Sequence, residues 1–118
     1  MLVVIDDLPN GVIGLRALGE VALEDFATVV EPTVDEVVAR AAQLRLVFHL
    51  GPDFTGFGPG AWGEMTSDIR TMPFHRGAVV TDDDRIRTGV NVLKWLLRGQ
   101  VRTFRNHEYP QAVSWVAS

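Results

Sequence analysis

The sequence predicts an α/β fold in which a mixed β-sheet of about five strands is flanked by helices. Short apolar runs rich in Val, Ile and Leu alternate with longer segments in which apolar residues recur every three or four positions. The first two runs are separated only by Pro9-Asn10-Gly11, a turn that predicts an N-terminal antiparallel hairpin. The later runs are separated by helical segments, which predicts alternating β-α units joined by right-handed crossovers.

The composition is that of an ordinary globular protein, and we expect a single domain over residues 1–118. Apolar residues make up 47% of the chain and charged residues 22%, which argues against a disordered chain. No apolar run reaches the roughly 20 residues that a membrane helix needs. The sequence has no signal-peptide pattern and no cysteine, so we expect a cytoplasmic protein without disulfides.

The charge of the chain is uneven along its length. The formal net charge of -4 argues against nucleic-acid binding as the main role. Residues 1–42 hold eight acids and two arginines, a balance of -6, whereas residues 43–118 hold seven acids and nine bases, a balance of +2. This asymmetry suits either a homodimer or a partner with complementary charge, or two faces that are merely solvated.

The N-terminal part of the chain is expected to form the hairpin and one interrupted helix. The expected strands cover residues 1–8 and 12–18, and the expected helix covers residues 23–42. Pro32 lies inside the helical pattern and is expected to kink the helix or to divide it in two. Thr33 followed by Glu36 would then cap the second piece.

The rest of the chain is expected to alternate strands and helices. Residues 44–50 are the expected central strand, with His49 on its less apolar side. Asp82-Asp83-Asp84 would supply the N-cap of the third helix. The other expected elements are a helix over 61–72, a strand over 77–81, the third helix over about 84–97, a strand over 101–104 and a helix over 108–116.

The predicted functional site is the loop over residues 51–62, which leaves the carboxyl end of the central strand. Ligands and partners usually meet open α/β sheets at such loops. The aromatic residues of the loop line an apolar pocket or lid, or they seal the edge of the core beneath it. The candidate ligand- or partner-binding residues are His49, Asp53, Phe54, Thr55, Phe57 and Trp62.

Catalytic and cofactor-dependent functions find little support in the sequence. The three histidines do not have the spacing of a metal motif. Asp53 and Glu64 flank the loop without a second catalytic group. The glycine-rich stretch over 56–60 lacks the Gly-Lys-Ser/Thr of a phosphate-binding loop. We therefore expect no enzyme, no metal and no cofactor.

The third helix carries apolar side chains beyond its core stripe. Val92, Trp95 and Leu96 extend around its last turn. Trp95 and Leu96 either form an interface, since large apolar patches seldom face water alone, or Trp95 packs beneath the last strand. The bases on this helix are Arg85, Arg87, Lys94 and Arg98.

Several stretches of the chain resemble the SpoIIAA-like, or STAS-type, small proteins of bacteria. The stretches are VVIDDLPNGVIGLRALGEV, LEDFATVVEPTVDEVVA, LVFHLGPDFTGFGPGAW, AVVTDDDRIR and VRTF…AVSWV. The resemblance covers nearly the whole chain. It implies a mixed sheet flanked by helices and a non-enzymatic, cofactor-free domain that switches protein interactions.

The resemblance also implies a regulatory position within the loop. STAS-type switches such as anti-sigma-factor antagonists are phosphorylated on a hydroxyl residue in an Asp-Ser-Ser/Thr-Gly stretch after the central strand. The corresponding stretch here is Asp53-Phe54-Thr55-Gly56, so Thr55 is the candidate for phosphorylation and Phe54 stands where the family has a hydroxyl. We expect a non-catalytic regulatory domain that binds a protein through the 51–62 loop. The chain also looks similar to CRAL-TRIO-type lipid-binding domains, which makes a small apolar ligand or lipid under the same loop the alternative.

Overall fold

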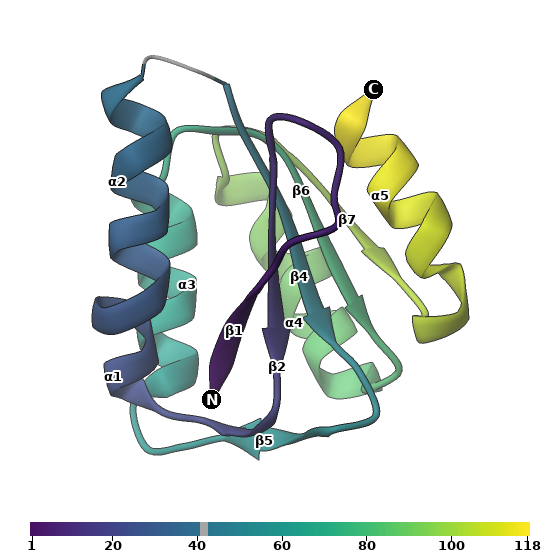
Figure 1. The fold of residues 1–118 in the computed structure, drawn as a ribbon. Coiled ribbons are helices and arrows are strands. Elements are labelled where there is room, and N and C mark those ends of the chain that lie inside the picture. Colours follow the sequence, from purple (N-terminus) through teal and green to yellow (C-terminus); the bar gives the residue numbers. More distant parts are fainter. Residues whose placement is uncertain (41–42) are drawn as a thin grey trace.

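The computed structural model describes residues 1–40 and 43–118, and its main feature is a five-stranded sheet (Figure 1). The strand order is β1-β2-β4-β6-β7; β1 runs antiparallel to β2, and the other pairs are parallel. The predicted mixed sheet with its N-terminal hairpin is therefore confirmed. The strands are β1 (Leu2–Ile5), β2 (Val12–Ala17), β4 (Leu44–Leu50), β6 (Phe74–Thr81) and β7 (Gln100–Phe104).

Helices cover both faces of the sheet. Three of the longer helices, α2, α3 and α4, lie on one face, whereas α5 alone lies on the other (Figure 1). Leu44 and Leu50 of β4 face the three-helix side, and Val47 between them faces α5. The α-helices are α1 (Leu23–Asp25), α2 (Glu31–Ala39), α3 (Ala61–Thr71), α4 (Asp84–Leu93) and α5 (Tyr109–Ala117).

The first helical segment is continuous through Pro32. The π-helical turn η1 (Phe26–Val30) joins α1 to α2, and Pro32 lies in the first turn of α2, directly after η1. Because proline has no N–H, one carbonyl of the preceding turn lacks its helical donor there. The predicted Thr33 cap is wrong, because its hydroxyl donates to the carbonyl of Val29 inside the helix, at 2.6 Å. The C-terminal end of the predicted helix, residues 41–42, lies outside the described residues.

Two short strands that the sequence did not predict form a second sheet. They are β3 (Gly19–Val21) and β5 (Phe54–Phe57), which pair in parallel. The prediction that residues 51–62 are a loop throughout is therefore wrong in its middle. The backbone N–H of Gly19 donates to the carbonyl of Asp53 at 2.7 Å, and that of Gly58 donates to Val21 at 2.8 Å. These bonds hold residues 53–58 against β3, the strand that leads into α1.

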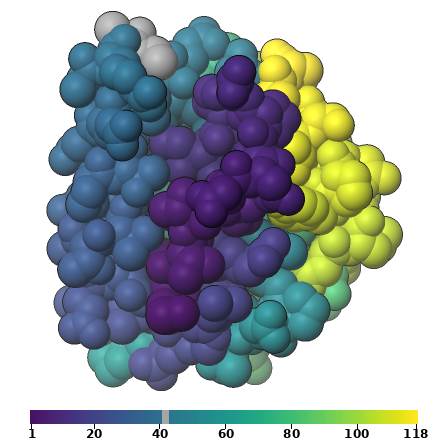
Figure 2. All heavy atoms as spheres, in the orientation of Figure 1, coloured from purple at the N-terminus to yellow at the C-terminus, as the bar shows by residue number. Residues whose placement is uncertain are grey.

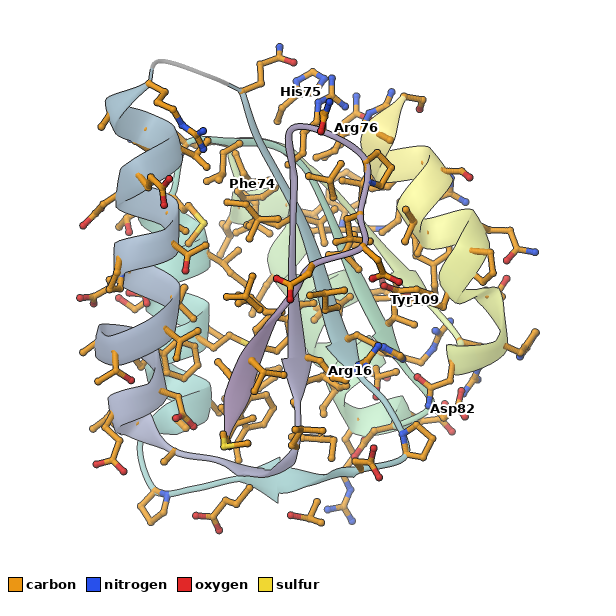
Figure 3. All side chains as sticks on the ribbon, viewed as in Figure 1. Arg16, Phe74, His75, Arg76, Asp82 and Tyr109 are labelled. Carbon is orange, nitrogen blue, oxygen red and sulfur yellow. The ribbon has the colours of Figure 1, made fainter. Side chains whose placement is uncertain are left out.

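Helix α5 is held near its C-terminal end by arginines of the main sheet, and the turn that precedes it is held by Asp82, the residue after β6. The Arg45 guanidinium donates to the carbonyl of Val116, and that of Arg76 donates to Trp115 at 2.8 Å. At the other end, Asp82 accepts a hydrogen bond from the backbone of Asn106 at 3.0 Å. Arg76 and Asp82 accordingly lie near opposite ends of α5 (Figure 3). The turn η3 (Asn106–Glu108) leads into α5.

Other element boundaries differ from the predictions by a few residues. Strand β6 begins at Phe74 instead of residue 77, and α4 ends at Leu93, followed by the 3-10 turn η2 (Lys94–Leu96). The N-terminal segment lies across the front of the molecule, between α2 and α5 (Figure 2). Of the helices described, none is both long enough and apolar enough to cross a bilayer.

Candidate functional site

The aromatic residues of the 51–62 segment form one row at the carboxyl end of the sheet. The Phe54 and Phe57 rings meet edge to face with centroids 5.2 Å apart, and the Phe57 and Trp62 rings do the same at 5.4 Å. All three side chains are half-buried and pack against the core. They therefore seal the core edge and at the same time present aromatic surface to solvent.

The first turns of α4 complete this row into an open groove of about 450 Å³. Trp62 reaches across to α4, where a Cβ on Gly89 would lie only 2.9 Å from its ring. The groove therefore has an aromatic wall from β5 and α3 and a polar rim from α4. We call it the aromatic groove, and its residues are Phe54, Gly56, Phe57, Trp62, Asp83, Arg85, Ile86 and Gly89.

The α4 side of the aromatic groove was not identified from the sequence as part of the site. Asp83 was predicted only as an N-cap, and this is confirmed: its carboxylate accepts from the backbone N–H groups of Arg85, at 2.9 Å, and Ile86, at 3.3 Å. These bonds fix the first turn of α4 beside β5. One feature of the sequence could have identified this side of the groove. The strand that ends at Thr81 has its carboxyl end at the same edge of the sheet as the central strand, and the loops of neighbouring parallel strands meet at that edge.

Thr55 and Asp53 are exposed, but neither lines the aromatic groove. Thr55 lies within β5, between Phe54 and Gly56, six residues before α3 begins at Ala61. A phosphate on Thr55 would therefore not lie at the start of α3. It would add negative charge beside the aromatic row instead.

His49 does not belong to the aromatic groove, because its side chain lies on the opposite face of the sheet. Its ring stacks on Tyr109, the first residue of α5, with centroids 4.6 Å apart. Burial and the neighbouring Arg16 guanidinium lower the pKa of His49. The alternation of side chains along β4 sends His49 toward α5, where its ring lies beside Gly51 at the start of the 51–62 segment. His49 is therefore outside the aromatic groove, and its role in binding stays a prediction. Arg16 and Tyr109 both lie on this side of β2 and β4 (Figure 3).

Glu64 lies near two other carboxylates and not in a pair with Asp53. Oxygens of Glu31, Glu64 and Asp68 all lie within 4.8 Å of one another at the junction of α2 and α3. Burial of Asp68, followed by repulsion from Glu64 and Glu31, raises the pKa of Asp68 to about 6. A proton on Asp68 therefore relieves the repulsion in mildly acidic solution.

An apolar cavity of about 60 Å³ lies between the sheet and the three-helix layer. Phe26, Met65, Val79 and Val90 are among its buried lining residues, and Asp68 is the ionisable residue beside them. The aromatic residues of the groove do not line it. The sequence suggested an apolar pocket under the 51–62 segment. The structure has an open groove beside that segment and a small apolar cavity at a different place, beneath the three helices.

The last turn of α4 and η2 leave apolar side chains in solvent. The exposed fractions are 67% for Val92, 82% for Trp95 and 62% for Leu96. Of the two alternatives that the sequence left open for Trp95, packing beneath the last strand is therefore wrong. Whether it forms an interface stays a prediction.

Comparisons with known proteins agree with this architecture. The family model described as SpoIIAA-like matches residues 12–117. No curated protein matches the sequence. An uncharacterised protein of the DUF3478 family with a SpoIIAA-like fold, from Shewanella loihica PV-4, superposes with a TM-score of 0.72 at 15% identity, covering 98% of this chain and 92% of that one. The unphosphorylated anti-sigma factor antagonist SpoIIAA superposes with a TM-score of 0.66 at 8% identity, covering 97% and 98%.

Proposed function

Since this chain belongs to the SpoIIAA-like family, we propose that it is a non-catalytic regulatory domain that binds a protein partner through the aromatic groove. One structural neighbour is an anti-sigma factor antagonist, a protein that acts by binding another protein. The observation that carries the proposal is the open aromatic row with Asp83 and Arg85 on its rim. Aromatic and arginine side chains dominate the binding energy of protein interfaces.

The shape of the aromatic groove suits one class of contact. An apolar side chain of a partner would lie against Phe57 and Trp62, and the flanking polar groups of that partner would pair with Asp83 or Arg85. Such a contact buries aromatic surface that water now covers. Thr55, exposed on the neighbouring strand, is the position where a phosphate would weaken or redirect the contact by its charge.

The test compares partner binding by variants of the rim with matched variants elsewhere. Arg85 and Arg40 are both exposed arginines; Arg85 lies on α4, and Arg40 follows the last residue of α2. We expect Arg85→Glu to weaken binding of an affinity-captured partner by about tenfold, because it reverses a charge on the rim of the groove, and Arg40→Glu to leave it unchanged. Equal binding by the two variants would contradict the proposed groove.

Thr55 is tested separately because the groove can function without it. Thr55→Glu adds a negative charge beside the aromatic row, and Ser114→Glu adds one to an exposed hydroxyl position on α5. We expect only Thr55→Glu to weaken partner binding. Partner binding that is the same in both variants removes Thr55 from the mechanism while leaving the aromatic groove in place.

A small apolar ligand is the second candidate, favoured by the apolar cavity. Its volume of about 60 Å³ is well below the roughly 300–1,000 Å³ of ordinary ligand sites. A lipid chain would therefore require α3 and α4 to move apart, which makes this the weaker proposal. Native mass spectrometry of freshly purified protein tests it: a co-purified mass supports a ligand, and the bare mass of the chain counts against one.

A further inference from the structure

The exposed apolar residues of α4 and η2 form one contiguous surface. Val92, Trp95 and Leu96, which we call the α4 tip, are spaced three and four residues apart and so share one side of the helical segment. Helix α4 has ten residues, a length of about 15 Å. The α4 tip thus lies at the C-terminal end of α4, at the edge of the sheet where β6 and β7 begin. Val92 is about one turn beyond Gly89, the last residue of α4 that lines the aromatic groove.

The surroundings of the α4 tip are basic. Of the six arginines and lysines between residues 85 and 107, Lys94 and Arg98 are those beside the tip. Of the others, Arg85 lines the aromatic groove and Arg105 pairs with Asp84. Lys94 lies within the tip itself, with its ammonium 5.7 Å from the centre of the Trp95 ring, and Arg98 follows it. Both side chains are exposed. The α4 tip therefore combines an exposed indole, aliphatic side chains and positive charge.

The start of β6 lies beside the α4 tip. A Cβ on Gly99 would lie 2.3 Å from the carbonyl oxygen of Phe74, so the turn after the α4 tip packs directly on the start of β6. Exposed His75 follows Phe74 and lies, with Arg76, at this end of the sheet (Figure 3). Leu93 and Leu97 line the apolar cavity together with Ile69 of α3. The C-terminal end of α3 therefore also lies close to the α4 tip.

The charge decides between the occupants that could cover the α4 tip. A symmetric dimer through this surface would bring Lys94 and Arg98 against their own copies, and like charges facing each other disfavour such contacts. Contact with the acidic N-terminal part of a second copy would be head to tail, which gives rings or filaments instead of a simple dimer. A negatively charged occupant that also accepts an indole fits better. Tryptophan with flanking lysine and arginine is the composition of membrane-interface segments.

We propose that the α4 tip docks this protein on an anionic lipid surface. Trp95 and Leu96 enter the headgroup region, and Lys94 and Arg98 pair with lipid phosphates. The α4 tip shares no residue with the aromatic groove, so docking through the tip leaves the groove residues available. The surface would therefore set where the protein meets its partner without blocking that partner.

The test is sedimentation of the full chain with vesicles of two compositions. We expect binding to vesicles of phosphatidylcholine mixed with phosphatidylglycerol, little binding to phosphatidylcholine alone, and weaker binding as salt rises. Trp95→Ala should weaken binding by about tenfold, and Lys94→Gln by about fivefold. The matched controls are Val38→Ser and Arg40→Gln, which change exposed apolar and basic residues of α2 and should bind as the unmodified chain does.

Three results would overturn the proposal. The first is failure of the unmodified chain to sediment with the anionic vesicles at low salt. The second is equal binding by Trp95→Ala and Val38→Ser. The third is a molar mass by light scattering that rises with concentration in the unmodified chain but not in Trp95→Ala, which would assign the α4 tip to a second copy. None of these results bears on the aromatic groove.

Discussion

The two faces of the five-stranded sheet are stabilised in different ways. On the three-helix face, α2, α3 and α4 bury the larger apolar cluster, yet a cavity of about 60 Å³ remains among their side chains. On the other face, α5 covers a smaller cluster, with arginines of the sheet bound near its C-terminal end and Asp82 bound to the turn that precedes it. A single helix can bury only a limited apolar area. Hydrogen bonds to the sheet therefore supply part of the stability with which α5 is held in place. Three helices bury more area but leave a packing defect and a half-buried carboxylate.

The largest expected effect compares one phenylalanine on each face. Phe26 lines the cavity on the three-helix face, and Phe104 lies in the cluster beneath α5; both are buried. We expect Phe26→Ala to lower the free energy of unfolding by about 4 kcal/mol and Phe104→Ala by about 3 kcal/mol, because the first substitution enlarges a void that already exists. Urea denaturation of both variants measures the difference. The reverse order would mean that the three-helix face relaxes around the void.

The next prediction concerns the polar attachment of α5. Arg76 and Arg102 both lie over the Trp115 ring, with guanidinium carbons 5.1 and 5.3 Å from its centre, but only Arg76 also donates to the backbone of α5. We expect Arg76→Met to cost about 1–2 kcal/mol of unfolding free energy and Arg102→Met about 0.5 kcal/mol. Thermal unfolding of both measures this. Equal losses would show that stacking on Trp115, and not the hydrogen bond, holds the helix.

The half-buried carboxylate of Asp68 on the three-helix face predicts that the stability of the chain depends on pH. The pKa of Asp68 is raised from 3.8 to about 6 in the folded chain, so the folded state binds this proton more tightly than the unfolded state does. Its contribution to stability is therefore greatest below pH 3.8, falls as the pH rises through about 6, and is constant above that. Asp68→Asn removes this contribution, and we expect it to stabilise the chain at pH 8 by about 1 kcal/mol after allowance for solvent screening.

Denaturation at several pH values checks the Asp68 prediction. The difference between Asp68→Asn and the unmodified chain should shrink as the pH falls from 8 to about 4, where Asp68 is protonated in the folded state. Asp35→Asn is the matched control, since Asp35 is an exposed acid on α2. A difference that does not vary with pH would place the Asp68 carboxyl in free solution.

The main sheet and its helices could be predicted from the sequence because their signals are local. Period-two alternation in β4 and the Asp83 cap each depend on a few neighbouring residues. Strands β3 and β5 were missed because each has only three or four residues and contains glycine, so neither shows a recognisable period. Their pairing depends on hydrogen bonds between segments that lie far apart in the chain.

Of the candidate site, only the aromatic wall from β5 and α3 could be predicted from the sequence. Phe54, Phe57 and Trp62 lie within nine residues of one another, so their proximity could be anticipated, but Arg85 and Gly89 reach the aromatic groove only through the packing of α4 on α3. Sequence alone could not decide the exposure of Trp95, because a helix with apolar residues on two sides is compatible with either burial or an interface. Both answers required the three-dimensional arrangement.

The smallest expected effect uses two adjacent valines on one strand. Val79 and Val80 of β6 are both buried and point to opposite faces: Val79 lines the cavity, whereas Val80 lies in the cluster beneath α5. Isoleucine adds one methylene at either position. On the three-helix face the added group enters empty space and should stabilise the chain by about 0.5 kcal/mol, whereas under α5 it overpacks the core and should cost about 1 kcal/mol. Urea denaturation of Val79→Ile and Val80→Ile measures the opposite signs; two losses would mean that the cavity is too narrow for a methyl group, and two gains would mean that α5 is packed as loosely as the three-helix face.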